Sequence, residues 1–170
     1  ESYDTTTVRA SVGNWLVSKY ISENSDVKVV FNGDGSDEVT MGYVYNALAP
    51  SDAAFREENV RLLKEIHLFD VLRSDRSISS CALEARTPFL DKDFVDFYMS
   101  IPTRYKRFGG ERPEKFILRN SFTHTGIIPE DVLWRSKCAF SDGVSASGKS
   151  WHNLVKKFVD ARLAEGVFES

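Results

Sequence analysis

Two glycine-rich stretches of this sequence contain residue types that could hold a nucleotide phosphate. The first is VKVVFNGDGSDEV at 27–39, and the second is GVSASGKS at 143–150. The second matches G-x-x-x-x-G-K-[ST], a pattern in which backbone amides surround the phosphates and the lysine reaches the outer ones. Either stretch would need a buried strand before its glycines and a helix after them. The flanking residues therefore decide which one is the better candidate.

The stretch at 143–150 has a poor leading strand. Only three apolar residues occur in the preceding KCAFSD, and no second strand ending in a magnesium-binding aspartate is evident. A chance match to this pattern is expected in roughly one of a few hundred chains of this size. We interpret it as a Gly/Ser-rich surface loop, with a nucleotide hydrolase that uses it as the alternative.

The stretch at 27–39 has the more suitable context. DVKVVF predicts a short strand buried on both faces. Gly33 and Gly35 would let several backbone N–H groups face one ligand, and Ser36 can cap the helix that follows. An acidic, solvated turn between a strand and a helix is the alternative reading of these residues.

Three carboxylates would crowd the end of this strand. Asp34, Asp37 and Glu38 lie within five positions of the sequence, which is costly unless they share a cation. Magnesium with a bound phosphate would satisfy them. A calcium loop does not fit, because counting from Asn32 or Asp34 puts Asp37 or Val39 where the loop requires glycine.

The elements that would position these residues are mostly helices. An apolar stripe after Asp4 predicts a first helix facing a core, capped by Asp4 or a nearby threonine. Residues 55–80 predict one long helix or two abutting helices, and Asp91 is expected to cap the next one, which Pro102 ends. Pro113, Pro129 and Trp151 would open further helices. The first stripe consists of Val8, Val12, Trp15, Leu16 and Tyr20. This pattern predicts an α/β fold, the helix-rich part of a larger parallel-sheet domain, with the strand's partners outside this chain.

Composition excludes several classes of protein. With 170 residues, 42% of them hydrophobic, the chain can form one domain with a core. The 22 basic and 25 acidic residues nearly balance, which argues against a nucleic-acid or membrane partner. No apolar run approaches the roughly 18 residues of a membrane span. Cys81 and Cys138 are read as reduced thiols of a cytoplasmic protein.

Four motifs resemble those of the asparagine synthetase family, glutamine-dependent enzymes whose synthetase half is of the ATP-pyrophosphatase, or adenine nucleotide alpha-hydrolase-like, type. NGDGSDE is similar to the family's S-G-E-G-S-D-E, and EARTPFLD to E-A-R-x-P-F-L-D. ESYDTTTVRAS resembles E-T-Y-D-(V)-T-T-(I)-R-A-S, and WRSKCAFSDGV resembles W-R-x-K-x-x-F-S-D-G-V. All four occur in the family's order, from Glu1 to Val144.

The resemblance implies a two-step reaction. ATP adenylates the side-chain carboxylate of aspartate and releases pyrophosphate, and ammonia from glutamine then displaces AMP to give asparagine. By motif position, Asp34 would assist formation of the acyl-adenylate and Asp37 would hold Mg²⁺ on the pyrophosphate. The residues that would line ATP are Asn32, Gly33, Gly35 and Ser36. Lys137 would stabilise the charge that develops on the phosphates.

The family's aspartate pocket implies a further set of residues. Asp70 and Arg73 lie near the EARTPFLD motif, and Glu84 and Arg86 lie inside it. Arginines suit carboxylate recognition because they donate two parallel hydrogen bonds. Structural ion pairs among these four residues are an equally good interpretation.

Several features depart from the family pattern. Asn32 replaces a serine and Asp34 replaces a glutamate that is one methylene longer, while SASGK at 145–149 reads as a loop insertion after the lysine motif. The family's S-G-G-x-D-S phosphate motif and the cysteine nucleophile that cleaves glutamine are both absent from these residues. The chain also starts without methionine. We therefore expect residues 1–170 to be part of one synthetase domain, truncated at both ends, and inactive alone. The glutaminase domain and the first part of the synthetase domain would lie elsewhere in a longer protein.

Other functions stay open at this point. A relative could close a lactam or amidate another carboxylate, and a scaffold descended from such a domain could bind a nucleotide without catalysis. The sequence also leaves open whether glutamine or free ammonia is the nitrogen donor and whether the protein is a homodimer.

Overall fold

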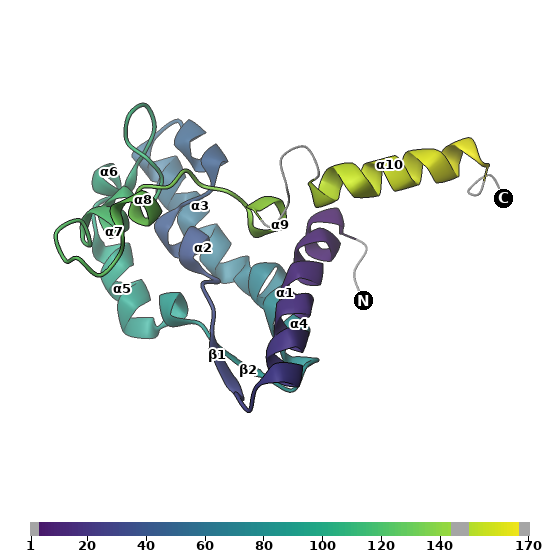
Figure 1. Cartoon of the computed structure of the whole chain (residues 1–170). Coiled ribbons are helices and arrows are strands. Elements are labelled where there is room, and N and C mark those ends of the chain that lie inside the picture. The colour runs from purple at the N-terminus through teal and green to yellow at the C-terminus, as the bar shows by residue number, and fades with distance from the viewer. Residues whose placement is uncertain (1–3, 144–149, 167–170) are drawn as a thin grey trace.

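The computed structural model describes residues 4–143 and 150–166 of the chain. Helices dominate it, and short 3₁₀ turns, labelled η, connect several of them (Figure 1). In chain order the elements are α1 Thr5–Asn24, β1 Val29–Phe31, α2 Ser36–Thr40, η1 Val44–Leu48, α3 Asp52–Glu65, η2 Ile66–Leu68, α4 Asp70–Ser79, β2 Glu84–Arg86, η3 Pro88–Leu90, α5 Lys92–Ser100, α6 Thr103–Lys106, α7 Phe116–Asn120, α8 Glu130–Leu133, α9 Phe140–Gly143 and α10 Trp151–Ala164. The helix-rich α/β fold is confirmed at this level.

The sheet in the described residues is a parallel pair of two strands, β1 and β2. Val30 is paired with Ala85, and the Asn32 amide donates to the Arg86 carbonyl at 2.9 Å. Parallel strands need a long crossover, and the helices α2 to α4 supply it here. The prediction that every partner of β1 lies outside the chain is therefore wrong. EAR in the EARTPFLD motif is a strand rather than an interruption between helices.

Strand β1 is not buried on both faces, contrary to the prediction from its β-branched composition. Phe31 is 81% exposed and Val29 is 46% exposed, whereas Val30 lies half-buried beside Ile78 of α4. In Figure 1 the strand pair runs between the α1–α4 helices and the α5 side of the molecule. Parallel sheets normally carry helices on both faces. Among the described residues, no helix covers the face that carries Val29 and Phe31.

Helix α1 begins as predicted but does not bury its predicted stripe. The Asp4 carboxylate accepts a hydrogen bond from the Thr7 amide at 2.7 Å, so Asp4 is the N-cap. α1 packs against α4 (Figure 1), yet Trp15, Leu16 and Tyr20 remain exposed. Because α1 carries apolar side chains on several sides, one neighbouring helix covers only part of them. The prediction that this stripe faces a core is wrong for the residues described.

The core is built from several elements, with α2 packed against both α3 and α5. Its buried apolar side chains are Val39, Met41, Phe55, Ile78, Leu83, Tyr98 and Leu133. The side chain of Asn59 on α3 is also fully buried and donates to the Glu38 carbonyl at 2.6 Å and the Val39 carbonyl at 3.3 Å. These bonds satisfy carbonyls of the short α2 helix that its own five residues cannot. Asn59 therefore fixes the helix that carries Asp37.

Local helix signals elsewhere are largely confirmed. Residues 55–80 form two helices, α3 and α4, joined by η2. Asp91 caps α5 by accepting from the amides of Asp93 and Phe94 at 3.0 and 3.1 Å, and Pro129 precedes α8. Helix α7 begins at Phe116 instead of at Pro113. The N-cap of α2 is Gly35 and no side chain caps it, so the prediction that Ser36 is the cap is wrong.

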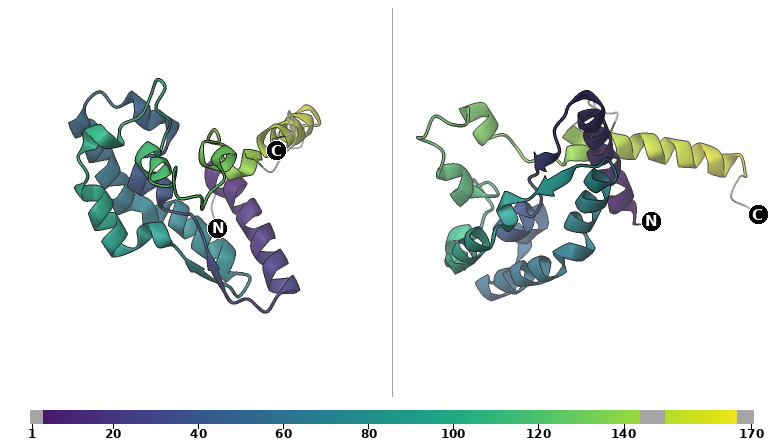
Figure 2. Two further views of the ribbon diagram at one scale, coloured as in Figure 1. Left: turned by 60° about the vertical axis from the view of Figure 1, so that its left-hand side comes forward. Right: turned by 90° about the horizontal axis from the view of Figure 1, so that it is seen from below.

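The GVSASGKS stretch lies mostly outside the described residues, which end at Gly143 and resume at Ser150. The residues that lead into it form the short helix α9 and not a strand. This agrees with the interpretation that the stretch lacks a leading strand. After it, α10 projects away from the remaining helices (Figures 1 and 2). Its apolar residues Leu154, Phe158 and Leu163 are exposed. Among the described residues, no helix is both long enough and apolar enough to cross a membrane.

Candidate active site

The turn after β1 is held by the side chain of Asn32. Its Oδ1 accepts from the Asp34 amide at 2.6 Å, and its Nδ2 donates to Asp34 Oδ2 at 2.9 Å. The same Nδ2 donates to Ser74 Oγ on α4 at 2.5 Å. Asparagine commonly closes turns in this way, through bonds to backbone two residues on. Asn32 thus fixes the Asp34 carboxylate relative to α4.

The two glycines of this turn have different roles. Gly35 has φ 85°, in the left-handed region, and a side chain there would collide with Leu90 of η3. At Gly33, no atom beyond the two neighbouring residues lies within 4 Å of the position that a Cβ would occupy. Packing therefore requires glycine at 35, whereas Gly33 leaves room for a ligand to approach the backbone.

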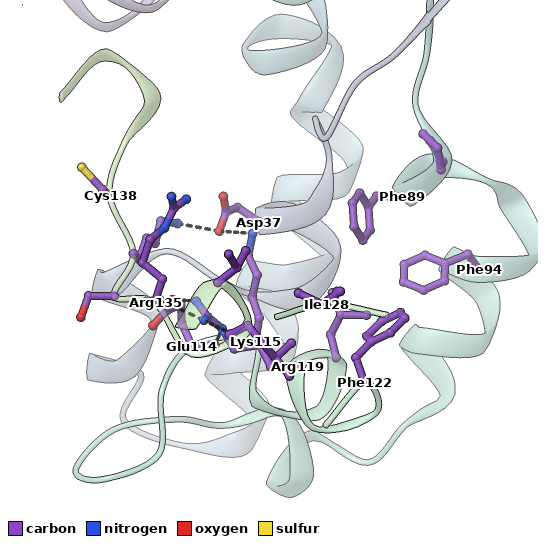
Figure 3. A pocket seen from close by; sticks show the side chains of 16 residues that line it. Asp37, Phe89, Phe94, Glu114, Lys115, Arg119, Phe122, Ile128, Arg135 and Cys138 are labelled. Atoms are coloured by element: carbon purple, nitrogen blue, oxygen red, sulfur yellow. Dashed lines mark hydrogen bonds and ion pairs between the residues drawn. The ribbon is translucent and has the colours of Figure 1, made fainter. Parts of the chain in front are cut away.

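Two lysines from distant parts of the chain meet at Asp37 (Figure 3). Lys137 Nζ lies 2.6 Å from Asp37 Oδ1, although the two residues are 100 positions apart, and it also donates to the Gly42 carbonyl at 2.8 Å. Lys115 Nζ lies 3.1 Å from the same carboxylate oxygen and 2.9 Å from Ser36 Oγ. Two ammonium groups thus share one carboxylate, which leaves a local surplus of positive charge.

Lys115 was missed by the sequence analysis, and its backbone is unusual. It is the N-cap of α7, with φ 58° and ψ 24°, in the left-handed region that non-glycine residues seldom adopt. Such a conformation costs about 1–2 kcal/mol for a residue with a Cβ. Strain of this kind persists where the surrounding structure over-determines it, commonly at ligand sites. Nothing in PEKFIL marks this lysine, because its partners are far away in the sequence, with Ser36 lying 79 positions earlier.

Gly42 is a second residue that the sequence analysis missed. A Cβ at this position would collide with the Asp37 carboxylate and the Lys115 side chain. Glycine here lets both side chains pass close to the backbone, and the Gly42 carbonyl then accepts from Lys137. A single glycine after a short helix resembles an ordinary helix stop, so its role is visible only in three dimensions.

Arg119 holds the segment that delivers Lys137. Its guanidinium donates to the Leu133 carbonyl at 2.6 Å and the Arg135 carbonyl at 2.9 Å. It also pairs with the Glu114 carboxylate and donates to the Glu114 carbonyl at 3.0 Å. The residues just before Lys137 and the residue before Lys115 are therefore bonded to one side chain. Arg119 positions both ammonium groups.

The three carboxylates of the DGSDE turn do not converge. Asp34 bonds to Asn32, and Asp37 pairs with the two lysines. Glu38 turns the other way, is only 4% exposed, and accepts from the Tyr43 hydroxyl. The prediction that the three crowd around one shared cation is therefore wrong. In a short helix, residues 37 and 38 point about 100° apart, so their side chains meet different partners.

A second buried acid reaches the same phenol as Glu38. The Tyr43 hydroxyl lies 2.6 Å from Asp70 Oδ2, and Asp70 also pairs with Arg73. A phenol has one proton and can donate to one carboxylate only. Burial and the neighbouring Asp70 raise the pKa of Glu38 to about 7. Although burial opposes it, hydrogen bonds from Glu38 and Tyr43 and the charge of Arg73 lower the pKa of Asp70. Glu38 is thus the acid that keeps a proton below neutral pH.

Tyr43 connects this pair of acids to the lysine cluster. Its ring centroid lies 4.8 Å from Lys137 Nζ, within the range of a cation–π contact, and its ring stacks on Tyr45 at 5.6 Å. Burial, followed by the hydrogen bonds to the two acids, raises the pKa of Tyr43 far above that of an ordinary phenol. Tyr43 is therefore a neutral platform beneath Lys137 over the whole physiological range.

The residues assigned to an aspartate pocket pair with one another. Asp70 bonds to Arg73 and Tyr43, and both partners of this ion pair are largely buried. Glu84 and Arg86 form an exposed pair at 2.6 Å, with 59% and 60% of their side chains accessible. Arg73 Nε is buried and makes no hydrogen bond with the described residues. The contacts given by the structure are those of the ion-pair interpretation, and an aspartate-binding role stays a prediction.

The described residues do not form a ready-made metal cage. None of their His, Cys, Asp and Glu side chains gather in groups of three or more that could hold an ion. Asp37 is the one predicted metal ligand, and two ammonium groups already contact it. Mg²⁺ is commonly bound through one or two carboxylates plus phosphate oxygens. Asp37 therefore fits Mg²⁺ only together with a phosphate, and the protein residues alone fit an anion better.

A cavity of about 610 Å³ opens beside the lysine cluster. Asp37 and Lys115 lie on one side of it and Phe89, Phe94 and Phe122 on the other (Figure 3). Lys137, which bonds to Asp37, also lines the cavity. Asp34 lines a different and smaller cavity, of about 340 Å³, beside α1. The DGSDE turn thus lies between two cavities, with Asp37 on the larger and Asp34 on the smaller, while Glu38 lines neither. The sequence predicts no role for His67 and Cys138 beyond packing or surface exposure. His67 is exposed and lines neither cavity, whereas Cys138 lines the larger one.

The family model described as asparagine synthase matches residues 1–53 and 45–169, which together cover nearly the whole chain. This chain belongs to the asparagine synthase family. Curated relatives described as glutamine-hydrolysing asparagine synthetases are 47% identical over 169 residues in Gallus gallus and 47% identical over 167 residues in Rattus norvegicus. The Homo sapiens protein is 46% identical over 167 residues.

Membership of the asparagine synthase family covers almost all of this chain but only part of its relatives. The alignments include 98–99% of these residues and 30% of the length of those three relatives. The resemblance in the four motifs is thereby confirmed at the level of the family. Both cysteines are free in the structure, as expected for reduced thiols.

Proposed function

We propose that this chain supplies the pyrophosphate-binding part of an ATP-dependent synthetase that converts aspartate to asparagine. The reaction would pass through a β-aspartyl-adenylate, with nitrogen from glutamine or ammonia. The observation that carries the proposal is the meeting of Lys115, Lys137 and Asp37 beside the glycine turn. Family membership supplies the reaction class, since the glutamine-hydrolysing asparagine synthetases named above are relatives of this chain.

The charge of the cluster suits a polyphosphate. Two ammonium groups on one carboxylate leave one positive charge without an acidic partner in the cluster, and the Ser36 hydroxyl adds a neutral hydrogen-bonding group. A pyrophosphate leaving group gains negative charge as its bond to the α-phosphorus breaks. Fixed cations stabilise that charge more in the transition state than in the ground state. Lys137 is the residue proposed for this role, and Lys115 would assist it.

The turn residues have supporting roles in this proposal. Asn32, Gly33, Gly35 and Ser36 would line the nucleotide, and Gly33 has the open space that a close approach to the backbone requires. Asp34 would assist the acyl-adenylate step, held in place by its two bonds with Asn32. If Asp37 also holds Mg²⁺, the ion supplies charge neutralisation on the bound phosphates.

Pyrophosphate binding to this chain tests the anion site directly. We expect isothermal titration calorimetry to show that Lys137→Ala weakens binding of pyrophosphate by about tenfold or more, as for loss of a charge-assisted contact. Lys149→Ala, in the GVSASGKS stretch, is the matched control and should bind like the unchanged chain. The opposite pattern would favour a hydrolase that uses GVSASGKS.

Exchange of labelled pyrophosphate into ATP tests the reaction. The chain spans about 30% of the length of its curated relatives, so this assay requires the full-length polypeptide. We expect exchange that depends on aspartate and is lost in Lys137→Ala. Exchange that ignores aspartate would indicate a lactam-forming or other amide-forming synthetase. No exchange, with pyrophosphate binding intact, would indicate a non-catalytic nucleotide-binding module.

A further inference from the structure

The larger cavity has an apolar part that the proposed function does not use. Pyrophosphate and aspartate are both small and polar, and the proposed function assigns the nucleotide to the turn at 32–36, which does not line this cavity. Apolar side chains line much of the rest of the cavity. Besides Val132 and Leu133, they are Pro88, Phe89, Phe94, Leu118, Phe122 and Ile128. We refer to these six residues as the apolar chamber. Figure 3 shows its aromatic side chains on the side of the cavity away from Arg135 and Cys138.

The chamber is large enough for a ring-sized ligand. The whole cavity measures about 610 Å³, which corresponds to roughly twenty water molecules at about 30 Å³ each. Pockets for drug-sized molecules measure about 300–1,000 Å³ and are mostly apolar with a few polar groups at defined places. This cavity has that composition, because its charged residues lie together at one end.

The walls of the chamber are fixed by the fold. Phe89 of η3 and Phe94 of α5 meet edge to face at 5.7 Å, and Phe94 in turn packs against the buried Tyr98 at 5.8 Å. On the opposite side, Arg119 ties α7 to the residues after α8. Ordered aromatic walls lower the entropic cost of binding, since few side chains must be immobilised.

The charged end selects an anion. Arg119 and Glu114 pair with each other, and Asp37 offsets only one of Lys115 and Lys137. The guanidinium of Arg135 lines the same cavity and adds a further positive charge. A ligand with an apolar body and one anionic group would match both ends at once.

We propose that this cavity binds small anions that carry an aromatic or aliphatic body, with the anionic group on Lys115 and Lys137 and the body in the apolar chamber. Such a ligand would exclude pyrophosphate from the lysine end, and this part of the inference rests on the proposed function. The chamber therefore defines a class of competitive inhibitor, namely phosphates, sulfonates or carboxylates with a ring-sized apolar group.

Phenyl phosphate and inorganic phosphate provide a matched pair of probes. They share the anionic group, and only phenyl phosphate has a ring to bury. We expect calorimetry on this chain to give an affinity for phenyl phosphate at least about tenfold higher than for inorganic phosphate. A tenfold difference corresponds to about 1.4 kcal/mol, and burial of a ring of this size contributes about 1.5–3 kcal/mol. Pyrophosphate should displace phenyl phosphate competitively.

Three variants separate the two ends of the cavity. Phe122→Ala should reduce the affinity for phenyl phosphate to nearly that for inorganic phosphate, without changing the latter. Phe97→Ala removes a phenylalanine of α5 that is 66% exposed and does not line the cavity, so it should change neither affinity. Lys137→Ala should weaken both probes. If circular dichroism shows that Phe122→Ala does not fold, Ile128→Ala on the same wall replaces it.

Distinct outcomes overturn the inference and the proposed function. Equal affinity for the two probes, with phosphate binding still dependent on Lys137, overturns the chamber and leaves the proposed function intact. Phosphate binding that Lys137→Ala does not weaken overturns the proposed anion site. Phenyl phosphate that binds this chain but not the full-length polypeptide would show that another segment fills the chamber, and this also overturns the inference.

Discussion

Lys106 gives the sharpest prediction about stability. Its side chain is only 4% exposed, and it forms none of the ion pairs found among the described residues. Its Nζ donates a long hydrogen bond of 3.5 Å to the Tyr98 carbonyl and lies 5.7 Å from the centre of the Tyr98 ring. Burial, followed by the positive charge of Arg56, lowers the pKa of Lys106 from 10.5 to about 8. The charged form is therefore costly in the folded state.

The size of this cost follows from the pKa change. A shift from 10.5 to about 8 corresponds to about 3 kcal/mol at neutral pH, at about 1.4 kcal/mol per unit. Lys106→Met removes the charge and keeps most of the volume, but it loses the bond to Tyr98, worth about 1 kcal/mol. We therefore expect Lys106→Met to raise the free energy of unfolding by about 2 kcal/mol near pH 7.

The pH dependence gives the prediction its sign. Because the pKa of Lys106 is lower in the folded state than in the unfolded chain, Lys106 does not destabilise the fold above about pH 10.5, where it is neutral in both states. That stability is lost as the pH falls through about 8, where folded Lys106 gains its costly charge. The advantage of Lys106→Met should shrink by about 2 kcal/mol between about pH 7 and about pH 9.5. The difference in the free energy of unfolding between Lys106→Met and the unchanged chain is taken at each pH, so the titration of other groups cancels.

Urea unfolding followed by circular dichroism measures both quantities. Lys64→Met, which removes an exposed lysine of α3, is the control and should change stability little at either pH. A Lys106→Met variant that is less stable than the unchanged chain near pH 7 would refute the reasoning. A gain that is the same at both pH values would also refute it, because the gain would then come from packing rather than from charge.

Three further predictions concern the residues that hold the turn and its helix. Gly35→Ala should lower the free energy of unfolding by about 1–2 kcal/mol because of its positive φ, and by more because the new Cβ collides with Leu90. Adding Leu90→Ala should remove the collision but not the cost of the positive φ. Full recovery of stability by the double variant in urea unfolding would contradict this prediction. Asn59→Ala should cost about 1–3 kcal/mol by leaving buried carbonyls without a donor, whereas the exposed control Asn120→Ala should have little effect in the same assay. Glu38→Gln tests the raised pKa of Glu38, which is about 7. The stability that protonated Glu38 contributes is complete below about pH 4.5 and is lost as the pH rises through about 7. The unchanged chain should therefore lose stability between about pH 5 and about pH 8, and Glu38→Gln should not. Parallel pH profiles of the two would contradict the raised pKa of Glu38.

Local features of the fold could be predicted from sequence because their causes are local. The Asp4 and Asp91 caps follow from side chains that bond amides two or three residues away. The strand at Val29–Phe31 follows from a β-branched run that ends in a glycine turn. Burial is different, since it depends on what covers a face. The same pattern that predicted a strand also predicted burial of Phe31, which the described residues do not provide.

The candidate site was predictable only where a motif marked it. Asp37 and Lys137 were assigned from separate motifs, and the structure brings them together at 2.6 Å. Lys115, Gly42 and Tyr43 belong to no motif used in the prediction. Their roles arise from contacts across long sequence separations, which periodicity and composition do not encode. Strand β2 was missed for a similar reason, because a run of only three residues is too short to predict a strand until β1 pairs with it.

Three non-glycine residues among those described have a positive φ, and two of them, Met41 and Lys115, lie beside Asp37, whereas Ala82 precedes β2. Lys115 adopts a left-handed backbone that disfavours any side chain, and Gly42 gives up a side chain where the Asp37 carboxylate passes. Each choice costs stability locally, and both serve the same contact between two ammonium groups and one carboxylate. A structural ion pair needs only one lysine per carboxylate, so the second lysine and the strain that delivers it favour a role in binding a ligand. Violations of local rules are expected where function requires them. Their coincidence with a surplus of positive charge is therefore the strongest physical argument that an anion binds at this point of the chain.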